Sequence, residues 1–206
     1  MEKIAELLIF IAVICSILLA IVIIVSFLHY RHSKNVAKKL LNESERNANL
    51  VYQLLKTAFP ASRIIRHPAL VMPNKQRIPS DLIMVESGGV YVFRIKNVPG
   101  MIDNSNKTVW TTSNRNGVFD FQNPFEQNKL PINAIEYILK RENIYNVPKY
   151  NIVVFTPKRV SFKIRNEHLT TADRLIDTVK DINSNRFLNA AEINTVLNAI
   201  KKYSSR

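Results

Sequence analysis

The chain has 206 residues, of which 47% are hydrophobic and 22% charged, a balance that excludes an intrinsically disordered protein. Its formal net charge of +13 at pH 7 predicts attraction to polyanions, such as nucleic acid or the anionic face of a membrane. The single cysteine, Cys15, excludes an intrachain disulfide.

An uncharged apolar run, Leu7–Leu28, lies near the start of the chain. At about 1.5 Å per helical residue it would measure roughly 33 Å, which is enough to cross the hydrocarbon core of a bilayer. A cleaved signal peptide is the competing interpretation, but the acidic start and the lack of a small-residue cleavage pattern do not suit one. We therefore expect a single retained transmembrane helix in contact with the lipid bilayer.

The charges on either side of this run predict its orientation. Residues 29–41 carry four lysines and arginines, whereas residues 1–6 carry one. The positive-inside rule then makes 1–6 a short extracytoplasmic end and predicts a single-pass protein of the cell membrane with a cytoplasmic C-terminal domain. The basic juxtamembrane linker 29–41 is expected to attract anionic lipid head groups.

The rest of the chain predicts alternating helices and strands. A helix is expected over Asn42–Thr57, capped by Ser44 and ended by Pro60. Another is expected over Phe125–Glu142, starting or kinked at Pro131. The remaining elements are strands at Arg63–Val71, Asp81–Val85, Val90–Lys96, Val109–Ser113, Val118–Phe121, Tyr150–Phe155 and Ser161–Ile164, and helices at Thr171–Asp181 and Asn189–Tyr203. This order predicts an α/β fold with a mixed sheet flanked by helices.

The stretch Asp81–Asn97 holds the residues most suggestive of chemistry. It places an acidic residue at the start of one short strand and a lysine at the end of the next. Because residues two apart on a strand share a face, Arg94 and Lys96 point the same way, and the hairpin brings Asp81 near them. Metal-dependent phosphodiester cleavage uses carboxylates to hold the ion and can use a lysine to orient the attacking water. The layout is therefore that of a metal-dependent nuclease site in which a second carboxylate is lacking.

The same stretch resembles the core of the NERD (nuclease-related) domain, a branch of the PD-(D/E)xK nuclease superfamily. That core runs Asp-His, three apolar residues, and then Gly-Val-aromatic-Val-Ile-Glu-x-Lys-Asn. The chain matches it without a gap through Asp81, Gly89, Val90, Tyr91, Val92, Lys96 and Asn97. Further matches are Gly100, Trp110, an Asn-Pro-x-x-Gln-Asn motif at Asn123–Asn128, and Glu45, which resembles the Glu of the family's N-terminal helix.

The resemblance implies a restriction-endonuclease-like fold over residues 42–156, with 157–206 as the C-terminal helical part of the same domain. It implies Asp81, Lys96 and Gln127 as catalytic residues. It also implies Mg²⁺ or Mn²⁺ as cofactor, with Asp81 as a metal ligand and Glu45 as a second candidate ligand.

The departures from the family pattern bear on catalysis. The family's Glu is Arg94 here, the His after the Asp is Leu82, and the Gln two positions upstream is Pro79. Asp, Glu and Lys together carry −1, whereas Asp81, Arg94 and Lys96 carry +1. At about 4 Å and an effective dielectric of about 20, the change weakens the interaction with Mg²⁺ by on the order of 10 kcal/mol, which is an upper bound. We expect Arg94 to form an ion pair with Asp81 instead.

Three functions stay open at this point. The favoured one is a membrane-tethered module that binds nucleic acid, with DNA preferred, through Arg94 and Lys96 without cleaving it. The second is a working nuclease in which another carboxylate, such as Glu126 or Glu136, replaces the missing Glu. The third is a non-catalytic assembly protein that recruits a protein partner of unknown identity.

Overall fold

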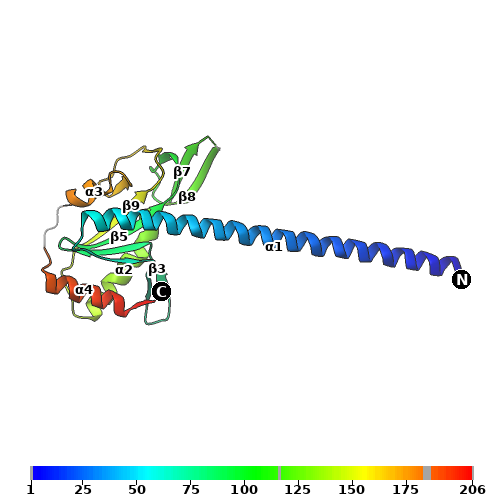
Figure 1. Cartoon of the computed structure of the whole chain (residues 1–206), viewed down its shortest axis with the longest axis horizontal. Helices are drawn as coiled ribbons and strands as arrows, with labels where there is room; N and C mark the ends of the chain where they lie inside the picture. The colour runs from blue at the N-terminus through cyan, green and yellow to red at the C-terminus, as the bar shows by residue number, and fades with distance from the viewer. Residues whose placement is uncertain (1, 116, 183–186, 206) are drawn as a thin grey trace. The chain divides into compact units, whose positions relative to one another are not determined.

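The computed structural model describes residues 2–115, 117–182 and 187–205, and for residues 2–20 and 37 it describes the backbone alone. The chain forms two compact units, Met1–Glu45 and Arg46–Arg206, and the division falls inside the first helix, α1 (Glu2–Ala58; Figure 1). The predicted helix start with Ser44 as cap is therefore wrong, because α1 continues through Ser44 without a break.

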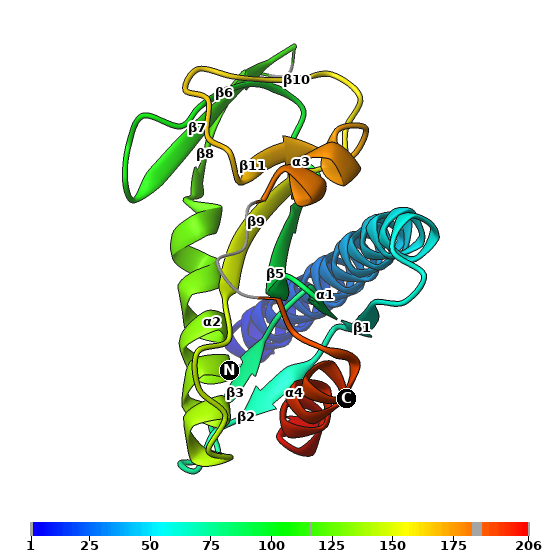
Figure 2. The same ribbon diagram turned by 90° about the vertical axis from the view of Figure 1, so that its left-hand side faces the viewer.

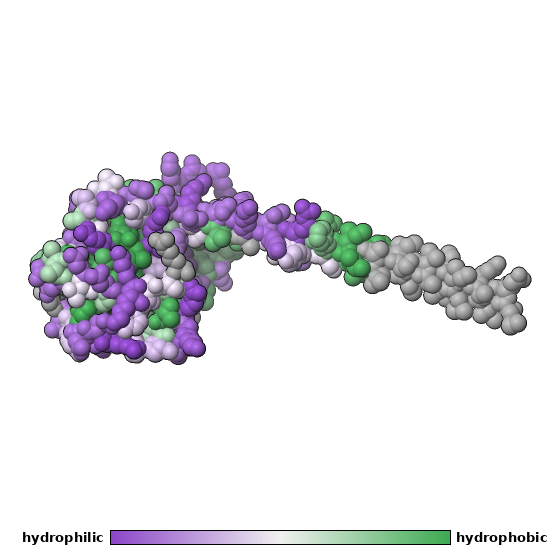
Figure 3. All heavy atoms as spheres, turned by 60° about the horizontal axis from the view of Figure 1, so that its bottom comes forward, coloured by the Kyte–Doolittle hydropathy of each residue, from purple (hydrophilic) through white to green (hydrophobic). Residues whose placement is uncertain are grey.

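The first unit is the N-terminal part of α1. Its large apolar side chains between Ile21 and Leu28 are all exposed, and they form the green band on the helix in Figure 3. Within the described residues, no helix combines the length and the apolar character that a membrane crossing requires. Most of the expected span Leu7–Leu28 falls on residues 7–20, whose side chains lie outside that description, so the span stays a prediction.

The second unit contains the remaining elements. The strands are β1 (Arg63–Arg66), β2 (Ala69–Val71), β3 (Arg77–Pro79), β4 (Leu82–Glu86), β5 (Gly89–Lys96), β6 (Gly100–Asp103), β7 (Val109–Asn114), β8 (Gly117–Gln122), β9 (Lys149–Phe155), β10 (Val160–Phe162), β11 (Leu169–Thr171) and β12 (Ser204–Ser205). The helices are α2 (Pro124–Arg141), α3 (Leu175–Asp181) and α4 (Ala190–Lys202).

Three further predicted elements differ from those observed. The strand expected over Arg63–Val71 splits into β1 and β2 at His67, whose φ of 46° bends the chain just before Pro68. The helix expected over Thr171–Asp181 is the end of β11 followed by the shorter α3. Helix α2 begins at Pro124 and runs through Pro131, so a start near Pro131 was wrong.

A five-stranded central sheet organises this unit, in the order β1-β4-β5-β9-β11. The pairs β1–β4 and β4–β5 are antiparallel, whereas β5–β9 and β9–β11 are parallel. The sheet is therefore mixed, as predicted. Two smaller sheets accompany it, β10-β6-β7-β8 and β12-β2-β3, and the first contains the predicted hairpin of β7 and β8.

Helices cover both faces of the central sheet, because each strand alternates its side chains between two apolar layers. On one face, Val90 and Val92 pack against α2 and α4. On the other face, Tyr91 and Phe93 pack against the C-terminal part of α1 and against α3. Figure 2 shows α2 running alongside β9 and β5. The result is a mixed α/β fold, consistent with a nuclease-like architecture.

Candidate functional site

The antiparallel pairing of β4 and β5 brings the predicted site residues together. Leu82 lies opposite Phe93, so the next positions in the register are Asp81 and Arg94. Asp81, Arg94 and Lys96 extend from the sheet face that α2 covers, since they share the alternation of the residues packed against that helix. The prediction that Arg94 and Lys96 share one face of the strand, with Asp81 near them, is thus confirmed.

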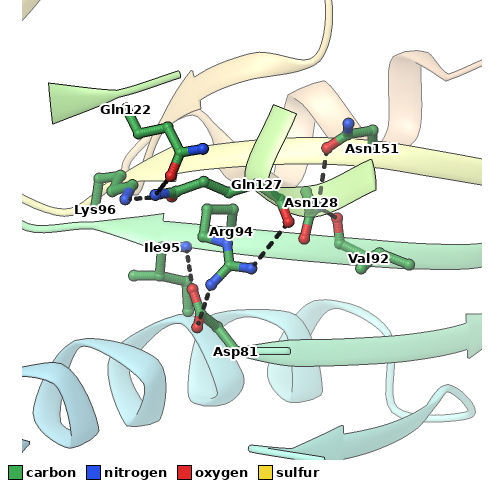
Figure 4. Close-up of polar contacts among 9 residues, drawn as sticks. All are labelled: Asp81, Val92, Arg94, Ile95, Lys96, Gln122, Gln127, Asn128 and Asn151. Atoms are coloured by element: carbon green, nitrogen blue, oxygen red, sulfur yellow. Dashed lines mark hydrogen bonds and ion pairs between the residues drawn. The ribbon is translucent and has the colours of Figure 1, made fainter. Parts of the chain in front are cut away.

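Both carboxylate oxygens of Asp81 accept hydrogen bonds (Figure 4). Arg94 Nη1 lies 3.2 Å from Oδ1, and the backbone N–H of Ile95 donates to Oδ2 at 2.7 Å. The Arg94 and Asp81 side chains are only 17% and 24% exposed, so water screens this ion pair less than it would a surface pair. The predicted ion pair between these residues is present.

Arg94 also reaches the backbone of α2. Its Nη2 lies 3.5 Å from the carbonyl oxygen of Gln127, a long hydrogen bond. In a regular helix that carbonyl would accept the N–H four residues later, but that residue is Pro131, which has no N–H. The proline therefore leaves the Gln127 carbonyl without its helical donor, and Arg94 supplies one.

Lys96 is held by a chain of side-chain amides. Its Nζ donates to Gln127 Oε1 at 2.7 Å, and Gln127 Nε2 donates to Gln122 Oε1 at 3.0 Å. Partial burial lowers the pKa of the Lys96 ammonium, the neighbouring Arg94 lowers it further, and Asp81 partly offsets both. The three predicted residues Asp81, Lys96 and Gln127 thus lie in one cluster, with Arg94 among them.

A set of asparagines positions α2 over the strands. Asn123 caps the helix by accepting the N–H of Phe125 at 2.9 Å. The fully buried Asn128 donates to the carbonyl of Val92 at 2.7 Å and to the side-chain oxygen of Asn151 at 2.9 Å. Asn151 in turn donates to the carbonyl of Phe125 at 3.0 Å. The sequence signalled Asn128 as the last residue of the Asn-Pro-x-x-Gln-Asn motif, but it gave no signal for Asn151.

The donor set at this site is a poor match for a divalent metal ion. It offers one carboxylate, whose two oxygens already accept from a guanidinium and an amide. Among the described residues, no group of three or more His, Cys, Asp or Glu gathers to hold a metal. Glu126 and Glu136 each pair with a lysine on α2, at 2.7 and 2.8 Å. Glu45 is an exposed residue of the first unit, and its assignment as a ligand stays a prediction.

Comparison with known proteins places these observations in a family. Residues 40–156 match the nuclease-related domain, NERD, which covers more than half of the chain. An uncharacterised protein of Bacillus anthracis is 30% identical over 126 residues, a segment that makes up 58% of this chain and 58% of that relative. The chain thus spans less than two thirds of the relative's length. Because the matched segment covers more than half of the chain and contains the Asp81–Lys96 strand pair, this chain belongs to the nuclease-related domain (NERD) family.

Proposed function

We propose that this protein binds nucleic acid at the cluster of Asp81, Arg94 and Lys96 without cleaving it, and that its N-terminal helix anchors it in a membrane. The observation that carries the proposal is the ion pair of Arg94 with Asp81. A cation stands where the family has its second carboxylate, and it neutralises the first. A divalent ion at this place would have to displace the guanidinium and would still find one acidic ligand.

The charge of the domain supports nucleic acid as the partner. The unit Arg46–Arg206 carries 24 lysines and arginines against 12 aspartates and glutamates. Such an excess attracts a phosphate backbone and makes binding sensitive to salt. At the site itself, Lys96 uses one of its three donors on Gln127, which leaves two for phosphate oxygens.

The exposed apolar residues of α1 support the membrane anchor. The large side chains from Ile21 to Leu28 are between 49% and 60% exposed, and a contiguous apolar surface of this kind marks contact with a partner or a lipid phase. With the uncharged residues before them they make the run Leu7–Leu28. Carbonate extraction of membranes tests the anchor on the full chain and on a fragment that begins at Ser33. Membrane retention of the full chain and release of the fragment would support the anchor. Release of the full chain would argue against it.

The binding proposal is tested with the full chain in mild detergent. Fluorescence anisotropy with a labelled duplex is measured across salt concentrations for the unmodified protein, Lys96→Met and the matched surface control Lys180→Met. We expect Lys96→Met to reduce the salt slope of log K by about one, while the control changes it less. Binding without salt dependence, or no binding at physiological salt, would leave an assembly role as the better explanation.

Cleavage is tested in parallel with supercoiled plasmid and Mg²⁺ or Mn²⁺. We expect no nicking by the unmodified protein, and nicking by Arg94→Glu if the restored carboxylate completes the metal site. Robust nicking by the unmodified protein that disappears in Asp81→Ala would overturn the proposal and establish a relocated carboxylate. The variant Asp81→Ala in the Arg94→Glu background is the control for contaminating nuclease.

A further inference from the structure

A second basic site lies in a hollow between α1, β1 and α4. The hollow has a volume of about 180 Å³. Tyr52 and Lys56 line it from the last turns of α1, Ser62 and Arg63 from the start of β1, and Lys201 from the last turn of α4. All of these residues belong to the unit Arg46–Arg206.

This hollow is separate from the cluster around Asp81. In the pairing of β1 with β4, Arg63 lies opposite Val85 and Arg66 lies opposite Leu82, the residue that follows Asp81. Arg63 is thus three residues from the Asp81 end of the pair, about 10 Å along the strand. A ligand in the hollow would therefore not need the residues of the first site.

Among the residues that the structure describes, the cations of the hollow have no carboxylate partners. Lys56 Nζ donates to the carbonyls of Pro60 at 2.7 Å and Ser62 at 3.4 Å, and Arg63 Nη1 donates to the carbonyl of Ala61 at 2.8 Å. These bonds hold the two cationic groups in place, but neutral carbonyls do not balance their charge. Lys201 forms no ion pair with any residue in the part of the chain that the structure describes.

A fourth cation stands beside the hollow. The guanidinium of Arg66 lies 4.9 Å from the centre of the Tyr52 ring, and its Nη1 donates to Asn49 Oδ1 at 3.2 Å. None of the described residues that line the hollow is acidic, whereas elsewhere in the domain lysines such as Lys163 and Lys202 pair with carboxylates. The positive side chains around the hollow repel one another, and an anion bound between them would reduce that repulsion.

The size of the hollow selects a small anion. Its volume of about 180 Å³ is well below the 300–1,000 Å³ that drug-sized ligands occupy. We propose that this hollow binds a compact phosphate group of high charge, a pyrophosphate or a phosphomonoester, through Lys56, Arg63 and Lys201. The group can come from a free phosphate compound or from the head group of a phospholipid, because the recognising chemistry is the same.

Isothermal titration calorimetry on the full chain in detergent tests the proposal. Inorganic pyrophosphate probes the free source. Dihexanoyl phosphatidic acid probes the lipid source, with dihexanoyl phosphatidylcholine as its control. The variants are Arg63→Gln and Lys201→Gln, and the matched control is Lys107→Gln, an exposed lysine outside the hollow. Circular dichroism verifies that each variant is folded.

We expect pyrophosphate or phosphatidic acid to bind, and each hollow variant to raise Kd by about tenfold or more, as for loss of a hydrogen bond to a charged group. Lys107→Gln should change Kd by less than about twofold, since it removes the same charge from elsewhere. Binding of one probe alone would identify its source. Binding of neither probe, or equal weakening by Arg63→Gln and Lys107→Gln, would overturn the proposal.

Discussion

The ion pair of Asp81 and Arg94 allows a quantitative prediction about stability. Asp81→Asn and Arg94→Gln each remove one charge and retain a polar side chain of similar size, and the double variant removes both. We expect the two changes to be strongly non-additive in the free energy of unfolding, because either one leaves its partner charge unpaired in a mostly buried place.

The structure sets the size of this coupling. At 3.2 Å and an effective dielectric of about 20, the Coulomb attraction is about 5 kcal/mol. Most of it is offset by the cost of removing both groups from water, and the 17% and 24% exposure of the side chains adds some screening. We expect a coupling energy of about 1–2 kcal/mol, above the 0.2–1 kcal/mol typical of exposed pairs.

Urea unfolding followed by tryptophan fluorescence measures this coupling. The chain has one tryptophan, Trp110, which is 2% exposed in the core of the second unit, so its emission reports on that unit. The control cycle is the more exposed pair Glu142 and Lys202, at 2.8 Å, for which we expect a smaller coupling because water screens it more. A coupling for Asp81 and Arg94 no larger than the control would refute the view that this mostly buried pair stabilises the fold more than an exposed pair does.

Three further predictions concern the surroundings of the site. Asn128→Ala should destabilise the unit by about 3 kcal/mol in the same urea assay, because the Val92 carbonyl and the Asn151 Oδ1 both lose the donor that Asn128 supplies; a loss below about 1 kcal/mol would contradict its anchoring role. Burial lowers the pKa of Lys96 from 10.5, so the folded state binds its proton less tightly than the unfolded state does. The free energy of unfolding should therefore rise as pH increases from the lowered pKa towards 10.5. Lys96→Met should remove that rise in urea titrations at alkaline pH. Phe155→Ala should cost about 4 kcal/mol by leaving a cavity, and a small loss would mean that the core collapses around it.

The strand pair was predictable from the sequence for a local reason. Its β-branched and aromatic residues mark the two strands, and the glycines at 88 and 89 mark the reversal between them. The relative placement of Asp81, Arg94 and Lys96 then followed from the alternation of side chains along a strand. The helix predicted over Asn189–Tyr203 is present as α4, which begins directly after a capping box formed by Asn189 and Glu192. Features set by a few neighbouring residues could thus be predicted.

The continuity of α1 shows what local signals miss. Ser44 was interpreted as the N-cap of a helix. A residue with capping propensity does not mark a helix start when the residues before it are themselves good helix formers, because the helix then continues through it. The chain contains no proline or glycine before Pro60, so no residue breaks the helix between Glu2 and Ala58. The opposite error occurred at His67, whose positive φ of 46° divides a run that has strand-like composition.

Arg94 and Pro131 are 37 positions apart in the chain, yet both determine the hydrogen bonding of the Gln127 carbonyl. The proline removes the helical donor of the Gln127 carbonyl, and the guanidinium bridges that carbonyl and the carboxylate of Asp81. Replacing Arg94 by glutamate would therefore leave the carbonyl and two carboxylates facing one another, which is unfavourable without a cation. Oxygen atoms alone are what Mg²⁺ prefers as ligands. The unmodified protein has the Arg94 guanidinium as the positive charge beside Asp81, and the Arg94→Glu variant would need a metal ion in its place. The Arg94→Glu test thus asks whether Mg²⁺ can replace the guanidinium at this site.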